Sequence, residues 1–468
     1  MYGIMVVEKN KKDVVKMSFE KIIYKLTDKR IPADTGLGLV GDILETAGFQ
    51  ERFKNVGSEN KRSKKHINTG EILITFIALL CKGNPDFDGV VEFQNDAAFY
   101  QTALHLQKGF PSSSTLRMRM DSIGKSQREQ LLKFNAHLLK SNKIKPTPLK
   151  NGLIPVDMDV TPMDNSNTKK EGVSWTYKKF MGYAPMMAYI GKEGYMVNTE
   201  LREGKQHCQN GTPDFLRQAI PLCREMTDKP LLVRLDSGND AAENVGILLE
   251  NGAFYVIKRN LRKEDRNEWA EKIRSWCKNI TQPREGKKVY IGTTYKDIFY
   301  TTESGEQKSI TNRIVYEMIE RSCDASGQYF LEPEIELNMF WTNLGESDSE
   351  IIELYHAHGE CEQFHSEIKT DMGVERLPSG KFDTNELVLE LTMIAYNILR
   401  MLGQEIVRQG NAPSKRVVKR RRIRTVIQNV IHFAGQVTKH ARQLILSLSR
   451  SNVWSEAYFC LTKKFSLS

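Results

Sequence analysis

The sequence predicts an α/β protein that begins with a helical region and ends with a basic one. Residues 1–150 carry apolar side chains at helical spacing. At about residue 151 the spacing changes to the alternation of a β-strand. Residues 229–260 then have the pattern of strand, helix and strand. A chain of 468 residues has room for roughly two to four domains.

The composition favours a folded protein with an acidic partner. Hydrophobic residues make up 40% of the chain, charged residues make up 27%, and the formal net charge is +10. Basic residues concentrate at 9–12, 61–66 and 415–424. Such clusters bind phosphate backbones, although a solvated basic tail has the same composition. The candidate DNA-binding side chains of the last cluster are Lys415, Arg416, Arg420, Arg421 and Arg422.

Hydropathy and cysteine usage predict the compartment. No apolar run approaches the length of about eighteen residues that a membrane span needs. The first residues lack the apolar core and cleavage site of a secretory signal. The seven cysteines are scattered without a C-x-x-C pair, which favours reduced thiols and argues against a zinc knuckle. We therefore expect a cytoplasmic, nucleoid-associated protein without membrane contacts.

The N-terminal region is expected to form several short helices. Pro111 and the serines at 112–114 provide a helix start before a basic helix. Short helices with basic ends suit a DNA-binding region, and they suit a plain helical bundle equally well.

An acidic strand is predicted over 154–160. Its apolar residues alternate with Asp157 and Asp159, so one face lies in a core and the other presents carboxylates. Further along, Asp236 lies at the C-terminal tip of a predicted strand, the edge of an open α/β sheet where ligands bind. An aspartate there can also cap a following helix, and a strand aspartate can simply face solvent.

Residues 263–345 alternate repeatedly and predict a β-rich insertion, which two helices follow. The first helix contains YHAHGECEQFHSEIK (355–369). Its polar residues at steps of three or four form one stripe: Tyr355, His358, Glu362, His365 and Lys369. A solvated helix face is the common explanation of such a stripe, and Glu362 could merely pair with His358.

Asp159, Asp236 and Glu362 together suffice to hold two divalent cations. Mg²⁺ and Mn²⁺ prefer carboxylate and water oxygens as ligands. Two such ions can activate a water or a 3′-hydroxyl group and stabilise the leaving oxygen of a phosphodiester. None of the three acids is persuasive alone, and Asp157 shares the strand face of Asp159.

The stripe resembles a signature of the DDE transposases of bacterial insertion sequences, and most closely of the insertion sequence 1380 family. That branch carries Tyr, two residues, Arg, three residues, Glu, six residues and Lys. This chain has the same spacing with His in the place of Arg, in Tyr355, His358, Glu362 and Lys369. Histidine is charged only below about pH 6.5, so it would bind phosphate less firmly than arginine.

Other segments resemble the same family in the same order. VDMDVT (156–161) is similar to its first acidic strand, in which the second Asp is the usual ligand, and this favours Asp159 over Asp157. VRLDSGNDAAENV (233–245) is similar to the segment of the second acid, Asp236. The resemblance covers roughly residues 110–405, including an apolar helix over 382–402.

The resemblance implies a ribonuclease H-like catalytic core with a β-strand insertion, an α-helical N-terminal domain and a basic helical tail. The expected divisions are a helical DNA-binding region (1–150), the first part of the core (151–262), the insertion (263–345), the second part of the core (346–405) and the basic C-terminal region (406–468).

The resemblance also implies an activity. Asp159, Asp236 and Glu362 would be catalytic residues that hold two Mg²⁺ or Mn²⁺ ions. The enzyme would cleave insertion-sequence ends, through a hairpin intermediate, and transfer the strands. Its partners would be double-stranded DNA, as terminal inverted repeats and target, and a second copy of the chain in a homodimer on DNA. The helix residues expected to contact DNA are Tyr355, His358 and Lys369.

Three alternatives remain open at the level of sequence. A metal-dependent nuclease on the same fold would carry the same acids. An inactive DNA-binding protein derived from a transposase would explain the histidine at position 358. Zinc binding by His356, His358 and His365 is disfavoured, because they lack H-E-x-x-H spacing and a nearby cysteine pair.

Overall fold

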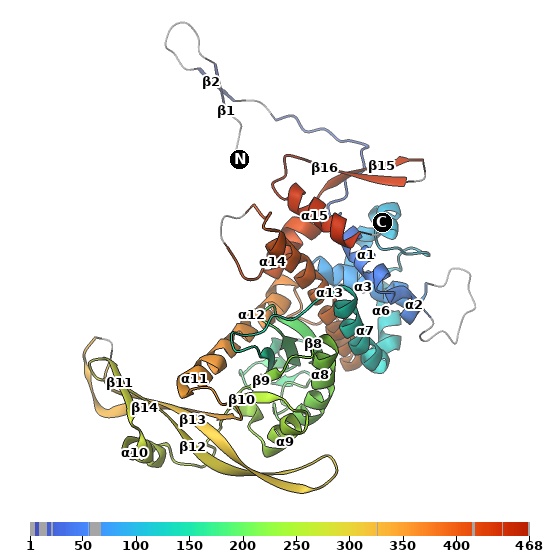
Figure 1. Ribbon diagram of the computed structural model, residues 1–468. Helices are drawn as coiled ribbons and strands as arrows, with labels where there is room; N and C mark the ends of the chain where they lie inside the picture. Colours follow the sequence, from blue (N-terminus) through green and yellow to red (C-terminus); the bar gives the residue numbers. More distant parts are fainter. Residues whose placement is uncertain are drawn as a thin grey trace.

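A nine-stranded mixed sheet lies at the centre of the protein. The computed structural model describes residues 5–8, 16–19, 22–54, 56, 67–324, 326–413, 417–441 and 443–466 (Figure 1). The strand order of the sheet is β11-β12-β13-β14-β10-β9-β3-β7-β8. The mixed α/β class predicted from the sequence is therefore confirmed. The basic clusters at 9–12 and 61–66 fall outside the described residues.

Five strands form the core of this sheet: β3 (Ile154–Val160), β7 (Met186–Ile190), β8 (Tyr195–Glu200), β9 (Leu231–Leu235) and β10 (Phe254–Lys258). β9 is parallel to both β3 and β10, whereas β7 is antiparallel to both β3 and β8. In the order β8-β7-β3-β9-β10, β7 is the one strand that runs against the other four. Because β3, β9 and β10 run the same way, their C-terminal ends share one edge.

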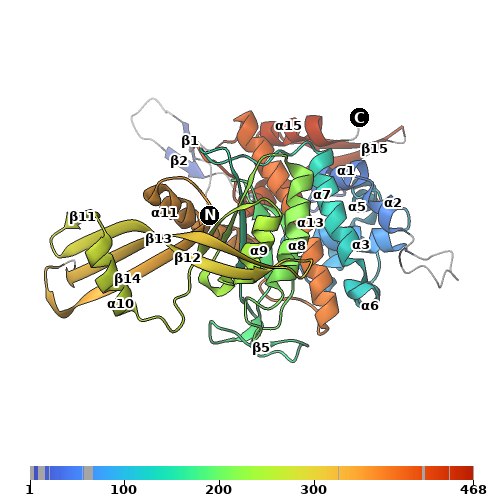
Figure 2. The same ribbon diagram turned by 60° about the horizontal axis from the view of Figure 1, so that its bottom comes forward.

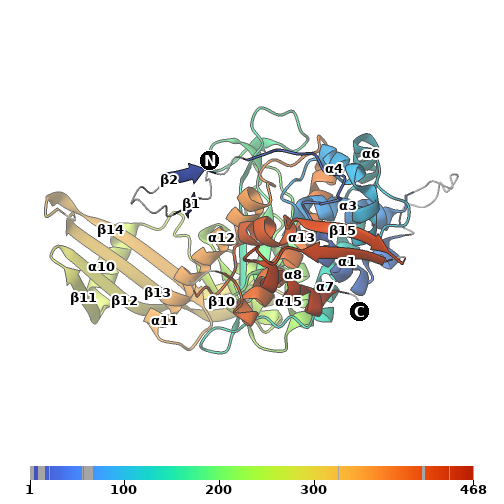
Figure 3. The same ribbon diagram turned by 90° about the horizontal axis from the view of Figure 1, so that it is seen from above.

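The β-rich segment continues the core sheet. It comprises α10 (Arg266–Trp276), β11 (Asn279–Arg284), β12 (Lys287–Thr301), β13 (Gln307–Cys323) and β14 (Tyr329–Thr342). Its strands pair antiparallel in sequence order, and the end of β14 pairs with β10, where Phe340 lies opposite Lys258. Figures 1 and 3 show these strands projecting from the core on the side away from the N-terminal helices.

Helices pack on the sheet beside its acidic edge. They are α8 (Thr212–Met226), α9 (Ala242–Glu250), α11 (Asp348–His356) and α12 (Glu360–Ser366). α8 contacts β8 and α9, whereas α11 contacts β10 and β13, and α12 contacts β3. Helix α11 begins with a capping box in which Ser347 and Glu350 each accept from the other's backbone N–H.

Helix α13 (Phe382–Gln409) links the sheet to the N-terminal helices. It is buried almost throughout between Thr384 and Ile406, and it contacts β8 as well as α3, α6 and α7. The N-terminal helices are α1 (Leu37–Thr46), α2 (Phe49–Phe53), α3 (Thr69–Cys81), α4 (Val90–Asn95), α5 (Ala97–Ala103), α6 (Ser113–Ile123) and α7 (Arg128–Ser141). One hydrophobic core therefore runs from these helices through α13 into the sheet.

Short elements complete the fold. Ser112 accepts a hydrogen bond from the Thr115 N–H, so α6 begins at the predicted start signal. A small sheet follows β3, and a hairpin lies near the N-terminus: β4 (Met163–Asp164), β5 (Ser174–Trp175) and β6 (Met181–Tyr183), then β1 (Met5–Glu8) and β2 (Lys16–Phe19). No helix among the described residues is long and apolar enough to cross a membrane.

The C-terminal region differs from the predicted helical tail. It contains the short helix α14 (Ile423–Val426), the hairpin of β15 (Gly435–His440) and β16 (Gln443–Leu448), and α15 (Ser455–Phe465). Leu444, Leu446 and Leu448 pack against the core from every second position of β16. This spacing is that of a strand, which is why a helical assignment fails here. Figure 2 shows α15 and β15 beside α1, and α15 contacts α1.

Candidate active site

The sheet edge brings two of the predicted acids together. Asp159 is the penultimate residue of β3, and Asp236 directly follows β9. The two strands are parallel neighbours in register, with Asp157 opposite Arg234, so Asp159 and Asp236 lie at the same end. Asp236 also caps the turn after β9, accepting from the Gly238 N–H at 3.2 Å and the Asn239 side chain at 2.8 Å. The capping role and the position at the sheet edge therefore coexist.

The third acid, Glu362, comes from α12 and faces the same edge. Burial, together with the nearby carboxylate charges of Asp236 and Glu362, raises the pKa of Asp159 to about 7. Burial and the same three carboxylates also raise the pKa of Tyr177, whose hydroxyl lies 3.4 Å from the Val160 carbonyl oxygen. Three acids that are far apart in sequence thus affect one another electrostatically at one end of the sheet.

Their donor chemistry fits a hard divalent cation. Among the described residues, no group of three His, Cys, Asp or Glu side chains already lies within the distance that a metal ion needs. Asp159 instead accepts a hydrogen bond from the Val160 N–H at 2.7 Å. Carboxylates of like charge at close quarters are stabilised by a cation, and their oxygens are the ligands that Mg²⁺ and Mn²⁺ prefer. The donor set fits these ions, and closer convergence of the three acids has to accompany binding.

Asp157 is engaged inside the protein. It is 3% exposed, and Arg234 donates to its two carboxylate oxygens at 2.6 and 2.7 Å. His358 Nδ1 lies 2.8 Å from the same carboxylate. Burial alone would raise the pKa of Asp157. The charge of Arg234 and the contact with His358 instead hold this pKa below its usual value. Asp159 is therefore the better-placed candidate ligand of the two.

The helix that carries the polar stripe is broken. Residues Ala357–Gly359 form a 3₁₀ turn between α11 and α12, and Glu367–Asp371 form a π-helical turn after α12. The predicted single stripe is therefore interrupted: His358 and His365 are buried, whereas Glu362 is exposed. His358 is 7% exposed and is turned inward to Asp157, a placement that does not suit a direct phosphate contact.

The other two stripe residues predicted to contact DNA lie near the acids. The ring of Tyr355 packs on Phe340 with centroids 4.6 Å apart, and burial with the charges of Asp236 and Asp159 raises its pKa. Lys369 donates from Nζ to the Pro162 carbonyl oxygen at 2.8 Å, three residues after Asp159. Both side chains are partly buried.

The three histidines of the zinc alternative do not converge. His356 is exposed, and His358 contacts Asp157. His365 is buried, with Nε2 3.6 Å from the Cys361 sulfur, and burial lowers its pKa to about 3. Their separate environments do not support a zinc site.

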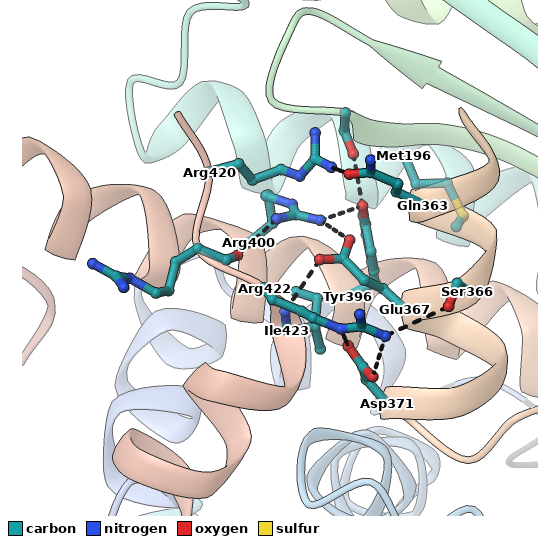
Figure 4. Close-up of polar contacts among 12 residues, drawn as sticks. Met196, Gln363, Ser366, Glu367, Asp371, Tyr396, Arg400, Arg420, Arg422 and Ile423 are labelled. Carbon is teal, nitrogen blue, oxygen red and sulfur yellow. Dashed lines mark hydrogen bonds and ion pairs between the residues drawn. The ribbon is translucent and has the colours of Figure 1, made fainter. Parts of the chain in front are cut away.

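The basic C-terminal segment folds back against α12 and the turn that follows it (Figure 4). Arg422 donates twice to Asp371, at 2.8 and 3.0 Å, and the buried Arg421 lies over the ring of Trp454 at 5.9 Å. These two side chains are therefore engaged in internal contacts. Lys415 and Arg416 lie outside the described residues.

Arg420 reaches toward the candidate catalytic helix. Its guanidinium lies 4.4 Å from the Phe364 ring centroid and donates to Gln363 at 2.8 Å. A cleft of about 380 Å³ lies between the segment and α12, lined by Gly359, Glu362, Gln363, Ser366, Glu367, Arg420 and Arg422. Arginines from the C-terminal segment and a candidate catalytic carboxylate thus share one open, polar cleft.

Sequence analysis did not identify two residues of this site, Arg234 and Tyr177. Arg234 is a charged residue within an otherwise apolar strand, LLVRL, and this was the available signal that it has a buried partner. Tyr177 gave no comparable signal, because it lies in a loop after β5, where no pattern of the sequence distinguishes it.

Comparison with known proteins supplies the family. A family model described as the transposase DDE domain, group 1, matches residues 15–467. The chain belongs to this transposase family. The predicted resemblance to DDE transposases is thereby confirmed at the level of the family, whereas the insertion sequence 1380 branch stays a prediction.

No curated protein matches this transposase-family chain. One solved structure with a similar arrangement is that of the piggyBac transposase in a synaptic complex with hairpin DNA, determined by cryo-electron microscopy. The two chains share 12% identity with a TM-score of 0.41, over 86% of this chain and 80% of that one. At so low a TM-score the likeness carries no conclusion about the activity or partners of this protein.

Proposed function

We propose that this protein is a DNA transposase that cleaves the ends of an insertion sequence and transfers them to target DNA. The observation that carries the proposal is the placement of Asp159 and Asp236 at the same end of two parallel neighbouring strands, with Glu362 on helix α12, which packs on β3. The match of the transposase family to residues 15–467 supports it. By its sequence signature we place the protein in the insertion sequence 1380 branch, with a hairpin intermediate.

The chain's own residues would position the DNA and neutralise its charge. Asp159, Asp236 and Glu362 would hold two Mg²⁺ or Mn²⁺ ions, which when bound polarise the phosphate, activate the nucleophile and stabilise the leaving oxygen. Lys369 lies beside the strand of Asp159, and Arg420 shares the cleft of Glu362. Positive side chains at these two places suit binding of the phosphates on either side of a scissile bond.

The proposed partners are the double-stranded terminal inverted repeats and a target duplex. Two ends have to be held together for transfer, so we propose a homodimer on DNA. The net charge of +10 favours such a polyanionic partner.

The test uses the full-length protein, Mg²⁺ and labelled duplexes that carry the inverted repeats flanking its gene. Hairpin or joined products on a denaturing gel are expected. Nicked products alone would favour the nuclease alternative. Binding without any cleavage in Mg²⁺ or Mn²⁺ would favour an inactive DNA-binding protein.

A neutral side chain at position 420 is expected to weaken DNA binding. Arg420→Gln keeps a polar side chain but removes the charge in the cleft, and a charge-assisted phosphate contact is worth about tenfold in affinity. The Kd should rise by this factor for all sequences, and the slope of log K against log salt should fall by about one. Fluorescence anisotropy at several salt concentrations measures both.

Arg450→Gln is the matched control, since Arg450 is an exposed arginine of the C-terminal region away from the residues that line the cleft. Its substitution should leave the Kd and slope close to those of the parent. Equal effects of the two substitutions would refute a specific contribution of the cleft.

A further inference from the structure

A buried ion cluster lies directly beneath the three candidate catalytic acids. It consists of Asp157 on β3, Arg234 on β9 and His358 in the turn before α12. All three are buried, at 3%, 3% and 7% exposure. Arg234 binds both oxygens of Asp157, and His358 approaches the same carboxylate at 2.8 Å. Arg234 also donates to the Leu354 carbonyl oxygen of α11 at 2.9 Å.

Each member of the cluster is spaced from one of the acids by a structural repeat. Asp157 and Arg234 precede Asp159 and Asp236 by two residues, which is the repeat of a strand. His358 precedes Glu362 by four residues, about one helical turn. The cluster therefore ties together the two strands and the helix that carry the acids, one layer below them.

The cluster also shows what the side chain at position 358 contacts in this chain. In this chain the partner of position 358 is an internal carboxylate, and the guanidinium that neutralises this carboxylate comes from Arg234. A buried charge cluster of this kind is retained only when its members satisfy one another, because an unpaired buried charge is costly.

We propose that Arg234 and His358 are positioning residues, which set the separation of Asp159, Asp236 and Glu362 by joining β3, β9 and the α12 turn through Asp157. The inference rests on the proposed function, because it concerns the same carboxylates. It differs from the role expected of position 358 by resemblance, in that His358 acts on the geometry of the acids and not on the DNA backbone.

The test compares His358→Ala with His358→Asn in the full-length protein. Asparagine carries an amide nitrogen on Cγ, as many bonds from Cα as Nδ1, and so can still donate to Asp157. The matched control is His356→Ala, an exposed histidine two residues away. Three quantities are measured for each variant: the rate of end cleavage under saturating DNA, the Kd for the DNA ends, and Mn²⁺ affinity from the electron paramagnetic resonance signal of free Mn²⁺.

The Ala variant is expected to lower the cleavage rate and Mn²⁺ affinity by about 10- to 100-fold, the usual effect of losing a residue that orients metal ligands. Its Kd for DNA should stay within about twofold. The Asn variant should have a cleavage rate and Mn²⁺ affinity within a few-fold of those of the parent. His356→Ala should match the parent in all three quantities. If His358→Ala fails to fold, His358→Phe, which keeps a ring at this position but has no ring nitrogen to contact Asp157, takes its place in the same three measurements.

Two results would overturn the inference. A weaker Kd for DNA with unchanged Mn²⁺ affinity would assign His358 to phosphate binding, and unchanged values of all three quantities would remove any role. Failure of the proposed function looks different: the parent protein would not cleave the ends, or Asp236→Ala would cleave them as well as the parent does.

Discussion

Asp159→Asn is expected to abolish DNA cleavage and at the same time to make the metal-free protein more stable at neutral pH. The carboxylate is lost as a ligand, and several kcal/mol of transition-state stabilisation correspond to a rate reduction of about 10³-fold or more. Cleavage of labelled ends in Mg²⁺ measures the first effect. Thermal unfolding in the presence of a chelator measures the second.

The stability gain follows from the raised pKa of Asp159. Its pKa is about 7 in the folded protein against 3.8 for a free side chain, so ionisation is disfavoured by folding. The destabilisation is absent below about pH 3.8, grows as the pH rises to about 7 and then stays constant, at up to about 4 kcal/mol. The variant should therefore exceed the parent in Tm at pH 8 and approach it near pH 4.

Asp157→Asn is the matched comparison, on the same strand two residues earlier. Its pKa is lowered in the folded protein, so its charge contributes stability above pH 3.8 that is lost as the pH falls. This variant leaves Arg234 and His358 without a full counter-charge and should lower the Tm at pH 8. Changes of the same sign in the two variants would contradict the assignment of Asp159 to the metal site and Asp157 to the internal cluster.

Arg400→Met is expected to be the most destabilising single change outside the site. Arg400 and Glu367 are 0% and 4% exposed and form an ion pair, and Arg400 also donates to the Tyr396 hydroxyl at 2.7 Å and the Arg421 carbonyl oxygen at 3.0 Å (Figure 4). Removing one partner of a buried pair leaves the other charged and uncompensated, at a cost of about 3–5 kcal/mol. Urea unfolding, followed by circular dichroism, measures it.

The double variant Arg400→Met with Glu367→Leu distinguishes the effect of an uncompensated buried charge from the effect of the lost hydrogen bonds of Arg400. Replacing both charges by apolar side chains is often close to neutral, so most of the lost stability should return. Arg408→Met is the control, since Arg408 is an exposed arginine of the same helix, and its buried partner Glu405 keeps its contacts with Lys464 and Gln409. It should have little effect. A double variant no more stable than Arg400→Met would mean that the loss comes from the hydrogen bonds of Arg400.

Most of the strand framework could be predicted because it depends on local pattern. The alternation over 154–160, the strand tip at Asp236 and the apolar helix after the signature all correspond to elements of the structure. The hairpin at 435–448 was missed although its leucines alternate, because a basic, mainly polar tail gives helix and strand similar support.

The ion pairs could not be predicted, because their members are distant in sequence. Asp157 and Asp159 share one strand face, and in the structure the contacts of Asp157 with Arg234, 77 residues away, and with His358 distinguish them. The basic cluster at 415–424 had the composition of a solvated tail. In the structure, Asp371 and Glu367 of the π-helical turn accept hydrogen bonds from Arg422 and Ile423. These contacts hold the segment against α12, and Arg420 and Glu362 then line the same cleft.

The pairing of β14 with β10 has a mechanical consequence. The backbone hydrogen bonds that hold the projecting strands continue without interruption into β10 and then β9, the strand that ends at Asp236. A load applied to β12 and β13 is therefore carried through β14 into the same sheet that supports the acids. Bending or twisting of this arm by a bound duplex would reach the carboxylates as strain along the sheet.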